Sequence, residues 1–335
     1  MQKRSDYIDV MRGIGIFSVV FVHIARPNNN PELILWIQSF YMPLFFFISG
    51  IVHKGSVGFV DFTKKKFKTI MIPYFFWAVL CFLYWVLLER RFRAAESQID
   101  ILDGLLGIVD GRYEHLVFNV VLWFLPVLFL VSVLFHLLLQ IDISDSKKNL
   151  VVFGSLIGLS CLGIILFEES WVWGLNKVFK YILFYGLGYY IRDYKIDEKI
   201  LKMKNCKLFS MVGIVAFGFI SFIMNEKGLR DAVWFYLIAI VGITIVFFVS
   251  IMTEKLALFK VIGQNTMGIL VMHGPLYRIL CVAVAYLTNL SVAELRENYW
   301  FALVLSFVTI GLIFIPIKIL RKILPWCLGV KQKKI

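Results

Sequence analysis

Charged residues are scarce in this sequence, and those of negative sign are the scarcer. Asp and Glu number 22 against 35 Lys and Arg, and together they make up 17% of the 335 residues. Soluble domains contain about 25% charged and about 45–50% apolar residues, whereas 60% of this chain is hydrophobic. The shortage of charge therefore excludes an ordinary water-soluble domain and indicates lipid as the surrounding medium.

Cysteine is also sparse, and its spacing excludes the chemistry that cysteine clusters usually support. No CxxC pair occurs, and no His lies at a metal-ligand spacing from a Cys. A lone Cys in an apolar run behaves as a small hydrophobic residue. The sequence predicts neither a disulfide framework nor a metal site at its five cysteines, Cys81, Cys161, Cys206, Cys281 and Cys327.

Polar linkers, low-complexity stretches and internal repeats are missing as well. We therefore expect one integral-membrane domain over residues 1–335, and the lack of a repeat disfavours the inverted-repeat transporters. The segment 89–115 is mixed in charge and partly amphipathic. It suits either a surface helix at an extracytoplasmic mouth or a solvated connector.

Long apolar runs are what the sequence does contain. A stretch of about 20 apolar residues spans the hydrocarbon core of a bilayer, and ten runs approach that length. They predict an all-α polytopic membrane protein with about ten transmembrane helices. Charges interrupt the first run, and no small-residue cleavage site follows it, which argues against a cleavable signal peptide. The runs are 8–25, 33–53, 70–88, 116–139, 150–167, 178–191, 208–224, 233–252, 266–287 and 300–320.

The net charge of +13 is explained by orientation and gives no reason to expect a nucleic-acid partner. Basic residues concentrate in alternate connections: segments 54–69 and 192–207 hold five and six, whereas 168–177 and 288–299 hold one each. Positive residues remain on the cytoplasmic side of a membrane. The pattern predicts cytoplasmic N- and C-termini and a multi-pass protein of the inner or plasma membrane.

The first run carries three ionisable side chains on one helical face. Asp9, Arg12 and His23 fall within a sector of roughly 80° on a helix of 3.6 residues per turn. Each charge at mid-bilayer costs ~2.5–3.5 kcal/mol, and an ion pair between Asp9 and Arg12 at i and i+3 lowers that cost. His23 lies ~16 Å further along the axis than Arg12. The face predicts an anion-holding Arg near the cytoplasm and a titratable His deeper inside.

A structural alternative exists for the same three residues. Asp9 and Arg12 could lie in one headgroup zone and His23 at the opposite interface, where long side chains snorkel and need no function. Gly13 and Gly15 favour close packing that buries this face. Ionisable side chains buried within a membrane protein usually have a function, so burial of this face favours a functional role for Asp9, Arg12 and His23.

The second helix and the connection after it offer further candidates. Ser49 and Gly50 end an aromatic run, and the Ser49 hydroxyl could bind a cofactor or a neighbouring helix. A lysine cluster, which includes Lys64 and Lys66, then precedes Tyr74. Such a cluster binds anionic lipid or sets topology, or it attracts a nucleotide phosphate through its field.

Five stretches resemble one known family in this order. Arg12, ten residues and His23 follow the opening "YIDVMRGIGIF", and the others are "FFFISG", "LWFLPVLF", "YGLGYYI" and "IGQNTMGILVMHGPLY". Together they resemble the integral-membrane acyltransferase-3 family, in particular its sugar O-acetyltransferase branch. The resemblance covers nearly the whole chain. Its departures are Ile51, where the family usually has Phe after Ser-Gly, and the absence of an appended hydrolase-like domain after the last helix.

The resemblance implies transfer of an acyl group from cytoplasmic acyl-CoA, most simply acetyl-CoA, to a glycan hydroxyl. By that resemblance His23 would be the catalytic base and Arg12 would contact the donor. Asp9, the predicted partner of Arg12, is a further candidate for the catalytic set. Ser49, Lys64, Lys66 and Tyr74 join Arg12 as donor-binding candidates. The acceptor would be a cell-envelope or secreted polysaccharide or a lipid-linked saccharide. Both an acyl-His intermediate and simple deprotonation of the acceptor fit this scheme.

Three residues are candidates for acceptor binding. His273 in "ILVMHGPLY" could position the acceptor, although a lone His in a membrane helix more often makes a helix–helix hydrogen bond. Trp123 could stack on a sugar ring or anchor the helix at the interface. Asn265 begins the helix that contains His273.

Other functions fit some of the same features. A transporter of polysaccharide or acyl donor also carries polar groups in membrane helices, and so could a structural subunit of a polysaccharide synthase. An enzyme that transfers succinyl or a longer acyl group is a nearer alternative. A homo-oligomer is compatible with the sequence.

Overall fold

The computed structural model describes residues 6–28, 31–92, 99–142, 144–166, 171–226 and 232–330. Within these ranges the regular structure is entirely helical, with no strand, which confirms the all-α fold class.

Nine helical stretches among the described residues are long and apolar enough to cross a bilayer. They follow the predicted runs closely, because a buried peptide group in lipid must be hydrogen-bonded within its own helix. The one predicted run that is not among these nine is 178–191. It forms the 19-residue helix α10 (Leu175–Asp193), whose hydropathy is lower. The nine are Asp6–Ile24, Glu32–Ile51, Phe59–Glu89, Val120–Leu139, Lys147–Ile165, Cys206–Met224, Trp234–Met252, Thr266–Thr288 and Tyr299–Ile323.

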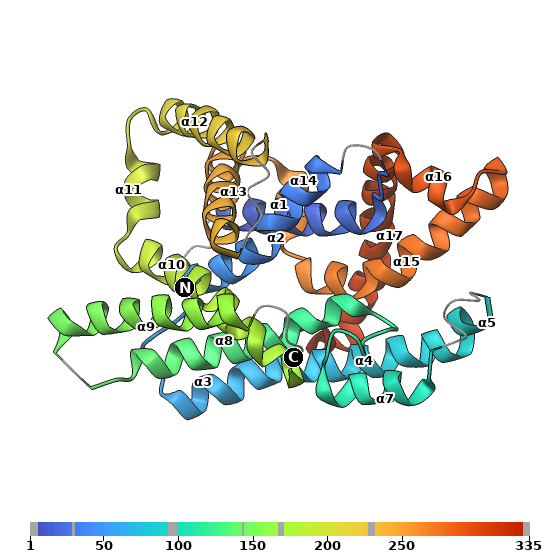
Figure 1. Ribbon diagram of the computed structural model, residues 1–335, viewed down its shortest axis with the longest axis horizontal. Coiled ribbons are helices and arrows are strands. Elements are labelled where there is room, and N and C mark those ends of the chain that lie inside the picture. Colours follow the sequence, from blue (N-terminus) through green and yellow to red (C-terminus); the bar gives the residue numbers. More distant parts are fainter. Residues whose placement is uncertain are drawn as a thin grey trace. The chain divides into compact units, whose positions relative to one another are not determined.

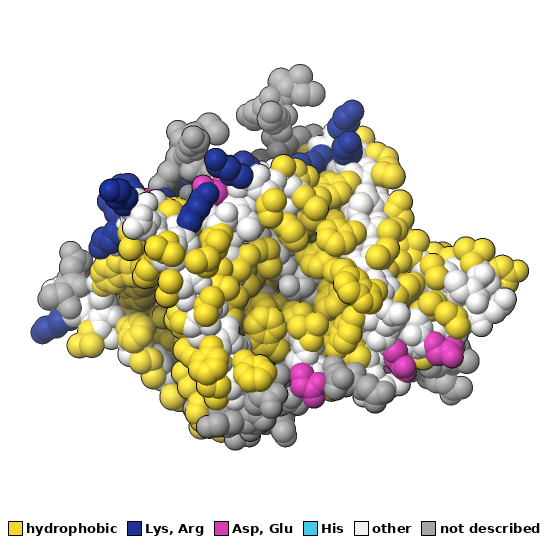
Figure 2. All heavy atoms as spheres, turned by 90° about the horizontal axis from the view of Figure 1, so that it is seen from above, with side chains coloured by type: hydrophobic (Ala, Val, Ile, Leu, Met, Phe, Trp, Pro, Cys, Tyr) yellow, Lys and Arg dark blue, Asp and Glu magenta, His cyan; other side chains and the backbone are white. Residues whose placement is uncertain are grey.

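Hydrophobic side chains cover much of the molecular surface, as Figure 2 shows for one face. Tyr286 is 85% exposed and Leu287 78% exposed. Only 11% of the apolar window Cys206–Met224 is buried within the chain. A soluble monomer rarely exposes apolar patches of this extent. The described chain therefore has the surface of a multi-pass membrane protein.

The chain divides into two compact units, each of which gathers segments distant in sequence. The first comprises Met1–His53, Phe184–Ile269 and Leu276–Ile313, and the second comprises Lys54–Leu183, Leu270–Pro275 and Phe314–Ile335. Figure 1 shows the helices in chain order. They are α1 (Asp6–Ile24), α2 (Glu32–Ile51), α3 (Phe59–Lys66), η1 (Phe67–Met71), α4 (Ile72–Tyr84), η2 (Trp85–Glu89), α5 (Arg90–Phe92), α7 (Ile101–Asp110), η3 (Val120–Trp123), α8 (Phe124–Leu139), α9 (Asp145–Ile165), η4 (Val172–Gly174), α10, α11 (Ile196–Lys202), α12 (Cys206–Glu226), α13 (Ala232–Met252), α14 (Ala257–Gly263), α15 (Thr266–Thr288), α16 (Val292–Glu297), α17 (Tyr299–Ile323) and η5 (Pro325–Leu328).

The first unit packs α1 against α2, α13 and α14. Glycine allows the closest of these approaches. A methyl group on Gly13 would overlap the carbonyl oxygen of Phe259 in α14, and one on Gly263 would overlap that of Asp9 in α1. The two backbones are therefore in direct contact, and side chains on α1 are held in fixed positions.

The second unit contains the longest helical stretch among the described residues, Phe59–Glu89, in which α3, η1, α4 and η2 follow one another without a break. Two of its segments, η1 and η2, are π-helical. Helix α7 is capped at its N-terminus by Asp100, whose side chain accepts a hydrogen bond from the Leu102 amide at 3.0 Å. Gly111 follows its last residue and adopts a φ of 62°, which favours glycine.

Candidate active site

The N-terminal half of α1 carries a buried ion pair. Asp9 Oδ1 lies 3.7 Å from Arg12 Nη1, which confirms the predicted i, i+3 pairing. The Asp9 side chain is 1% exposed and that of Arg12 24% exposed. Gln264, just beyond α14, donates from Nε2 to Asp9 Oδ2 at 2.9 Å. The Asp9 carboxylate therefore pairs with Arg12 through one oxygen and accepts from Gln264 through the other.

His23 lies in the last turn of α1 and is half-buried. Its Nδ1 is 2.7 Å from the carbonyl oxygen of Val19, one turn earlier. A carbonyl oxygen can only accept, so Nδ1 must carry the proton in this contact. In the neutral imidazole the basic lone pair is then on Nε2. The contact therefore sets the tautomer of the neutral ring.

Ser49 and Gly50 lie in the last turn of α2, where α2 is in direct contact with α10. A methyl group on Gly50 would overlap the carbonyl oxygen of Tyr185, and one on Gly188 would overlap that of Phe47. The motifs "FFFISG" and "YGLGYYI" are therefore packed on each other. Ser49 is half-buried beside this contact.

In the second unit a basic pocket of about 450 Å³ opens along α3 and η1. Lys64, Lys65 and Lys68 line it together with Trp326 of the C-terminal segment. Lys66 is directed elsewhere, with Nζ 5.4 Å from the centre of the Phe62 ring. Three ammonium groups and an indole ring on one cavity suit a ligand with phosphates and a planar base. The remaining lining residues are Asp61, Thr69, Gly329 and Val330.

The C-terminal wall of this pocket is anchored to α4. Trp77 donates from Nε1 to the carbonyl oxygen of Cys327 in η5 at 2.8 Å. The Phe76 ring meets the Trp326 ring edge to face, with centroids 5.1 Å apart. These contacts hold η5 against α4, so that it forms one wall of the pocket.

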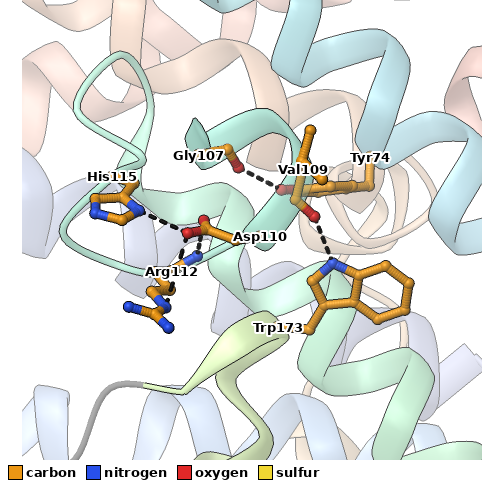
Figure 3. Close-up of polar contacts among 7 residues, drawn as sticks. All are labelled: Tyr74, Gly107, Val109, Asp110, Arg112, His115 and Trp173. Carbon is orange, nitrogen blue, oxygen red and sulfur yellow. Dashed lines mark hydrogen bonds and ion pairs between the residues drawn. The ribbon is translucent and has the colours of Figure 1, made fainter. Parts of the chain in front are cut away.

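A second polar group of the same unit surrounds the end of α7 (Figure 3). The buried Tyr74 donates its hydroxyl to the carbonyl oxygen of Gly107 at 2.9 Å. Asp110 Oδ2 lies 2.6 Å from His115 Nδ1, and its Oδ1 accepts from the Arg112 amide at 3.0 Å. Trp173 donates to the carbonyl oxygen of Val109 at 2.7 Å. These contacts connect α7 and the loop after it to their neighbours, and the Tyr74 hydroxyl binds the backbone of α7.

A sequence profile of the acyltransferase-3 family, described as an acyltransferase domain, matches residues 5–319. The chain belongs to the acyltransferase-3 family. It is thus a multi-pass membrane acyltransferase. Comparison with curated proteins and with solved structures found no match.

The predicted acceptor residues of this acyltransferase lie in different surroundings. Trp123 has the Lys177 ammonium 4.6 Å from its ring centre, and Tyr181 stacks with it at 6.0 Å. His273 is buried, with Nδ1 2.8 Å from the carbonyl oxygen of Leu270. Asn265 is buried and donates to the carbonyl oxygen of Val261 at 2.7 Å. These contacts neither assign nor remove a ligand role, which stays a prediction.

The structure brings some of the predicted site residues together within each unit. Asp9 and Arg12 are in contact, and Lys64 lines the basic pocket whereas Lys66 lies over Phe62. The first unit contains Asp9, Arg12, His23, Ser49 and Asn265, and the second contains Lys64, Lys66, Tyr74, Trp123 and His273.

The sequence did not reveal several polar residues that hold these sites in the acyltransferase. Gln264 binds Asp9 from a position 255 residues away. Asn119 donates to the carbonyl oxygen of Val271 at 2.9 Å, beside the turn of His273. Arg296 donates to the backbone of His23. For Asn119 alone the sequence offered a signal, because a polar side chain within an apolar run must find a hydrogen-bond partner in the membrane.

Proposed function

We propose that the protein transfers an acetyl group from acetyl-CoA to a glycan hydroxyl, with His23 as the general base. The observation that carries this proposal is the hydrogen bond from His23 Nδ1 to the Val19 carbonyl oxygen. It orients the imidazole and leaves Nε2 as the proton acceptor. Histidine suits this role because its ordinary pKa is close to neutral pH.

The reaction then follows from that nitrogen. Nε2 takes the proton of the acceptor hydroxyl while the hydroxyl oxygen forms a bond to the thioester carbonyl carbon. The carbon–sulfur bond breaks, and the CoA thiolate leaves and takes up a proton. Proton transfer to a positioned base contributes roughly 10²–10⁴-fold to such reactions. The membrane acyltransferase family of the chain supports this reaction class.

Donor binding is assigned to Arg12 and to the basic pocket. CoA carries phosphate groups, which lysines bind as point charges and arginine binds through paired N–H groups. Lys64, Lys65 and Lys68 would receive the nucleotide phosphates, and Trp326 would stack on the adenine. Arg12 would hold a further anionic group, with its geometry supported by Asp9. Ser49, Lys66 and Tyr74 stay donor-side candidates of lower rank, because Lys66 and Tyr74 already make structural contacts.

The acceptor is assigned to the extracytoplasmic side. We place the protein in the inner or plasma membrane with both termini in the cytoplasm, since basic residues concentrate in the corresponding segments. The acceptor is then a cell-envelope or exported polysaccharide or its lipid-linked precursor. Trp123, Asn265 and His273 are its candidate contacts.

The test uses the purified full-length protein in lipid nanodiscs with acetyl-CoA and envelope glycan extracted from the producing cells. Wild type should release CoA and add acetyl groups to the glycan, as measured by mass spectrometry. His23→Ala and His23→Gln should lose at least 100-fold in both readouts at unchanged thermal stability. His53→Gln is the matched control, because His53 is a half-buried histidine that bonds Tyr185.

Each outcome decides the proposal. CoA release that depends on His23 supports it, and full activity of both His23 variants removes His23 as the base. A protein that moves glycan or acyl donor across the membrane without CoA release would be a transporter. Succinyl-CoA assayed in parallel identifies an enzyme with another donor.

A further inference from the structure

A single arginine outside α1 holds the end of the helix that carries His23. Arg296, in α16, donates from Nη2 to the carbonyl oxygen of His23 at 2.7 Å. It also donates from Nε to the carbonyl oxygen of Ile24 at 2.8 Å. The guanidinium thus binds the backbone of His23 and of the next residue at the same time.

These carbonyl groups need a partner from outside the helix. The last four carbonyl groups of an α-helix have no amide within the helix to bind, and the C-terminus carries a partial negative charge that favours a cation. Arg296 satisfies two of them with a rigid, planar group. A lysine could reach only one at a time, because its ammonium is a single point.

The helix that carries Arg296 has hydrogen bonds from side chains at both of its ends. Helix α16 starts with a capping box, in which the Ser291 amide donates to Glu294 at 2.7 Å and the Glu294 amide donates to the Ser291 hydroxyl at 3.1 Å. Directly after it, Asn298 accepts from the Trp300 amide at 2.8 Å. The platform that bears Arg296 is therefore short and fixed at both ends.

The chain leaving α1 is tied to the same platform. The Arg26 amide donates to the carbonyl oxygen of Arg296 at 2.8 Å. Asn28 hydrogen-bonds Glu297, and the Phe21 and Tyr299 rings stack at 6.3 Å. The contact of Phe21 lies before His23 in the sequence, and those of Arg26 and Asn28 lie after it. The last turn of α1 can therefore neither fray nor rotate without breaking the contacts of Arg296.

We infer that Arg296 is a positioning residue of the acyl-transfer reaction, which holds the His23 imidazole at the reacting atoms through its backbone. The inference rests on the proposed role of His23 as base. It explains why a charged residue occurs at this point of a connection that otherwise has little positive charge. A displacement of about 1 Å at a catalytic group can cost roughly 100-fold in rate, so loss of the guanidinium should act on kcat.

The experiment compares Arg296→Gln, Arg296→Lys and Arg296→Ala with wild type in nanodiscs. We expect Arg296→Gln to lower kcat roughly 10–100-fold with KM for acetyl-CoA within about twofold. Arg296→Lys should recover part of that loss. Methylguanidine added to Arg296→Ala should raise kcat in proportion to its concentration, because it replaces the missing group. Arg26→Gln is the control, since it removes a neighbouring exposed positive charge and keeps the backbone amide that donates to Arg296.

Three outcomes would overturn the inference. They are a kcat of Arg296→Gln within twofold of wild type, a loss equal to that of Arg26→Gln, and a loss that follows reduced thermal stability and is not rescued by methylguanidine. If His23→Ala stays active, the proposed function itself fails. If His23→Ala is inactive while Arg296→Gln is normal, only the positioning role fails.

Discussion

Gly50 in α2 packs against a backbone carbonyl group of α10, and Gly188 in α10 packs against a backbone carbonyl group of α2. A side chain on Gly50 would overlap the Tyr185 oxygen, and one on Gly188 would overlap the Phe47 oxygen. Membrane helices gain most of their association energy from such close packing, because lipid tails compete with apolar side chains. The pair explains why two separate motifs contain glycine at these positions.

The first prediction concerns this contact. Gly188→Ala should destabilise the protein by about 1–3 kcal/mol, because the added methyl group forces the two backbones apart. Thermal unfolding in detergent, followed by fluorescence-detected gel filtration, measures the change. Gly218→Ala is the matched control, since a methyl group there meets no atom within 4 Å. An equal stability of both variants would contradict the close packing.

Most of the membrane helices could be predicted from hydropathy alone. The runs 8–25 and 266–287 became α1 and α15 with shifts of only a few residues at each end. An apolar run of this length in lipid has few alternatives to a helix. The prediction was less complete at 54–69, where the helix continues back to Phe59 through the lysine cluster. Lysine lowers hydropathy but favours helix, so the pattern hid this extension.

Helix α7 falls in segment 89–115, whose sequence is partly amphipathic. The short helices α14 and α16 and the contacts that hold the site were not predicted from the sequence. The partner of Asp9 was predicted only within its own helix, as Arg12. Gln264 and Arg296 reach α1 across more than 250 residues of sequence, and local pattern carries no information about such pairs.

The second prediction concerns Arg12. Arg12→Ala should raise KM for acetyl-CoA roughly 10–100-fold, because a charge-assisted hydrogen bond contributes about 1.5–3 kcal/mol. Steady-state kinetics at varied acetyl-CoA measures the effect. Lys260→Ala is the control, since Lys260 forms the more exposed pair with Asp6 at 2.7 Å. Such pairs contribute about 0–1 kcal/mol. An unchanged KM in Arg12→Ala would exclude its donor role.

The third prediction separates two lysines of one cluster. Lys64 lines the basic pocket, whereas Lys66 lies over the Phe62 ring. Lys64→Ala combined with Lys68→Ala should therefore weaken acetyl-CoA binding about tenfold or more, with a smaller salt dependence. Lys66→Ala should instead lower thermal stability by about 0.5–1 kcal/mol through its ring contact.

Binding of acetyl-CoA and of dephospho-CoA, measured by isothermal titration calorimetry, distinguishes the sources of the effect. If the pocket holds the 3′-phosphate of CoA, the variant with both Lys64→Ala and Lys68→Ala should bind acetyl-CoA more weakly than wild type does. Its affinity for dephospho-CoA, which lacks that phosphate, should be unchanged. Equal losses in Lys64→Ala with Lys68→Ala and in Lys66→Ala would mean that the cluster acts only through its overall field.

The last prediction uses the capping box of α16, which carries Arg296. The pKa of Glu294 is lowered because its carboxylate accepts hydrogen bonds from the amide and side chain of Ser291. A carboxyl whose pKa falls on folding stabilises the folded form above its unfolded pKa of about 4.3 and loses that contribution as pH drops through the lower folded value. Amide hydrogen exchange at 292–297 should therefore show weaker protection below about pH 4, after correction for the intrinsic exchange rate.

Glu294→Gln isolates the effect of the carboxylate's charge. The side-chain oxygen of the glutamine can still accept a hydrogen bond from the Ser291 amide, but the group does not titrate in acid. The variant should show lower protection than wild type at pH 7, and its protection should not change as the pH falls. Ser291→Ala removes the hydroxyl that the Glu294 amide binds, which should also weaken the cap at neutral pH. If wild type and Glu294→Gln lose protection in parallel, the acid sensitivity arises elsewhere and the cap does not hold the platform of Arg296.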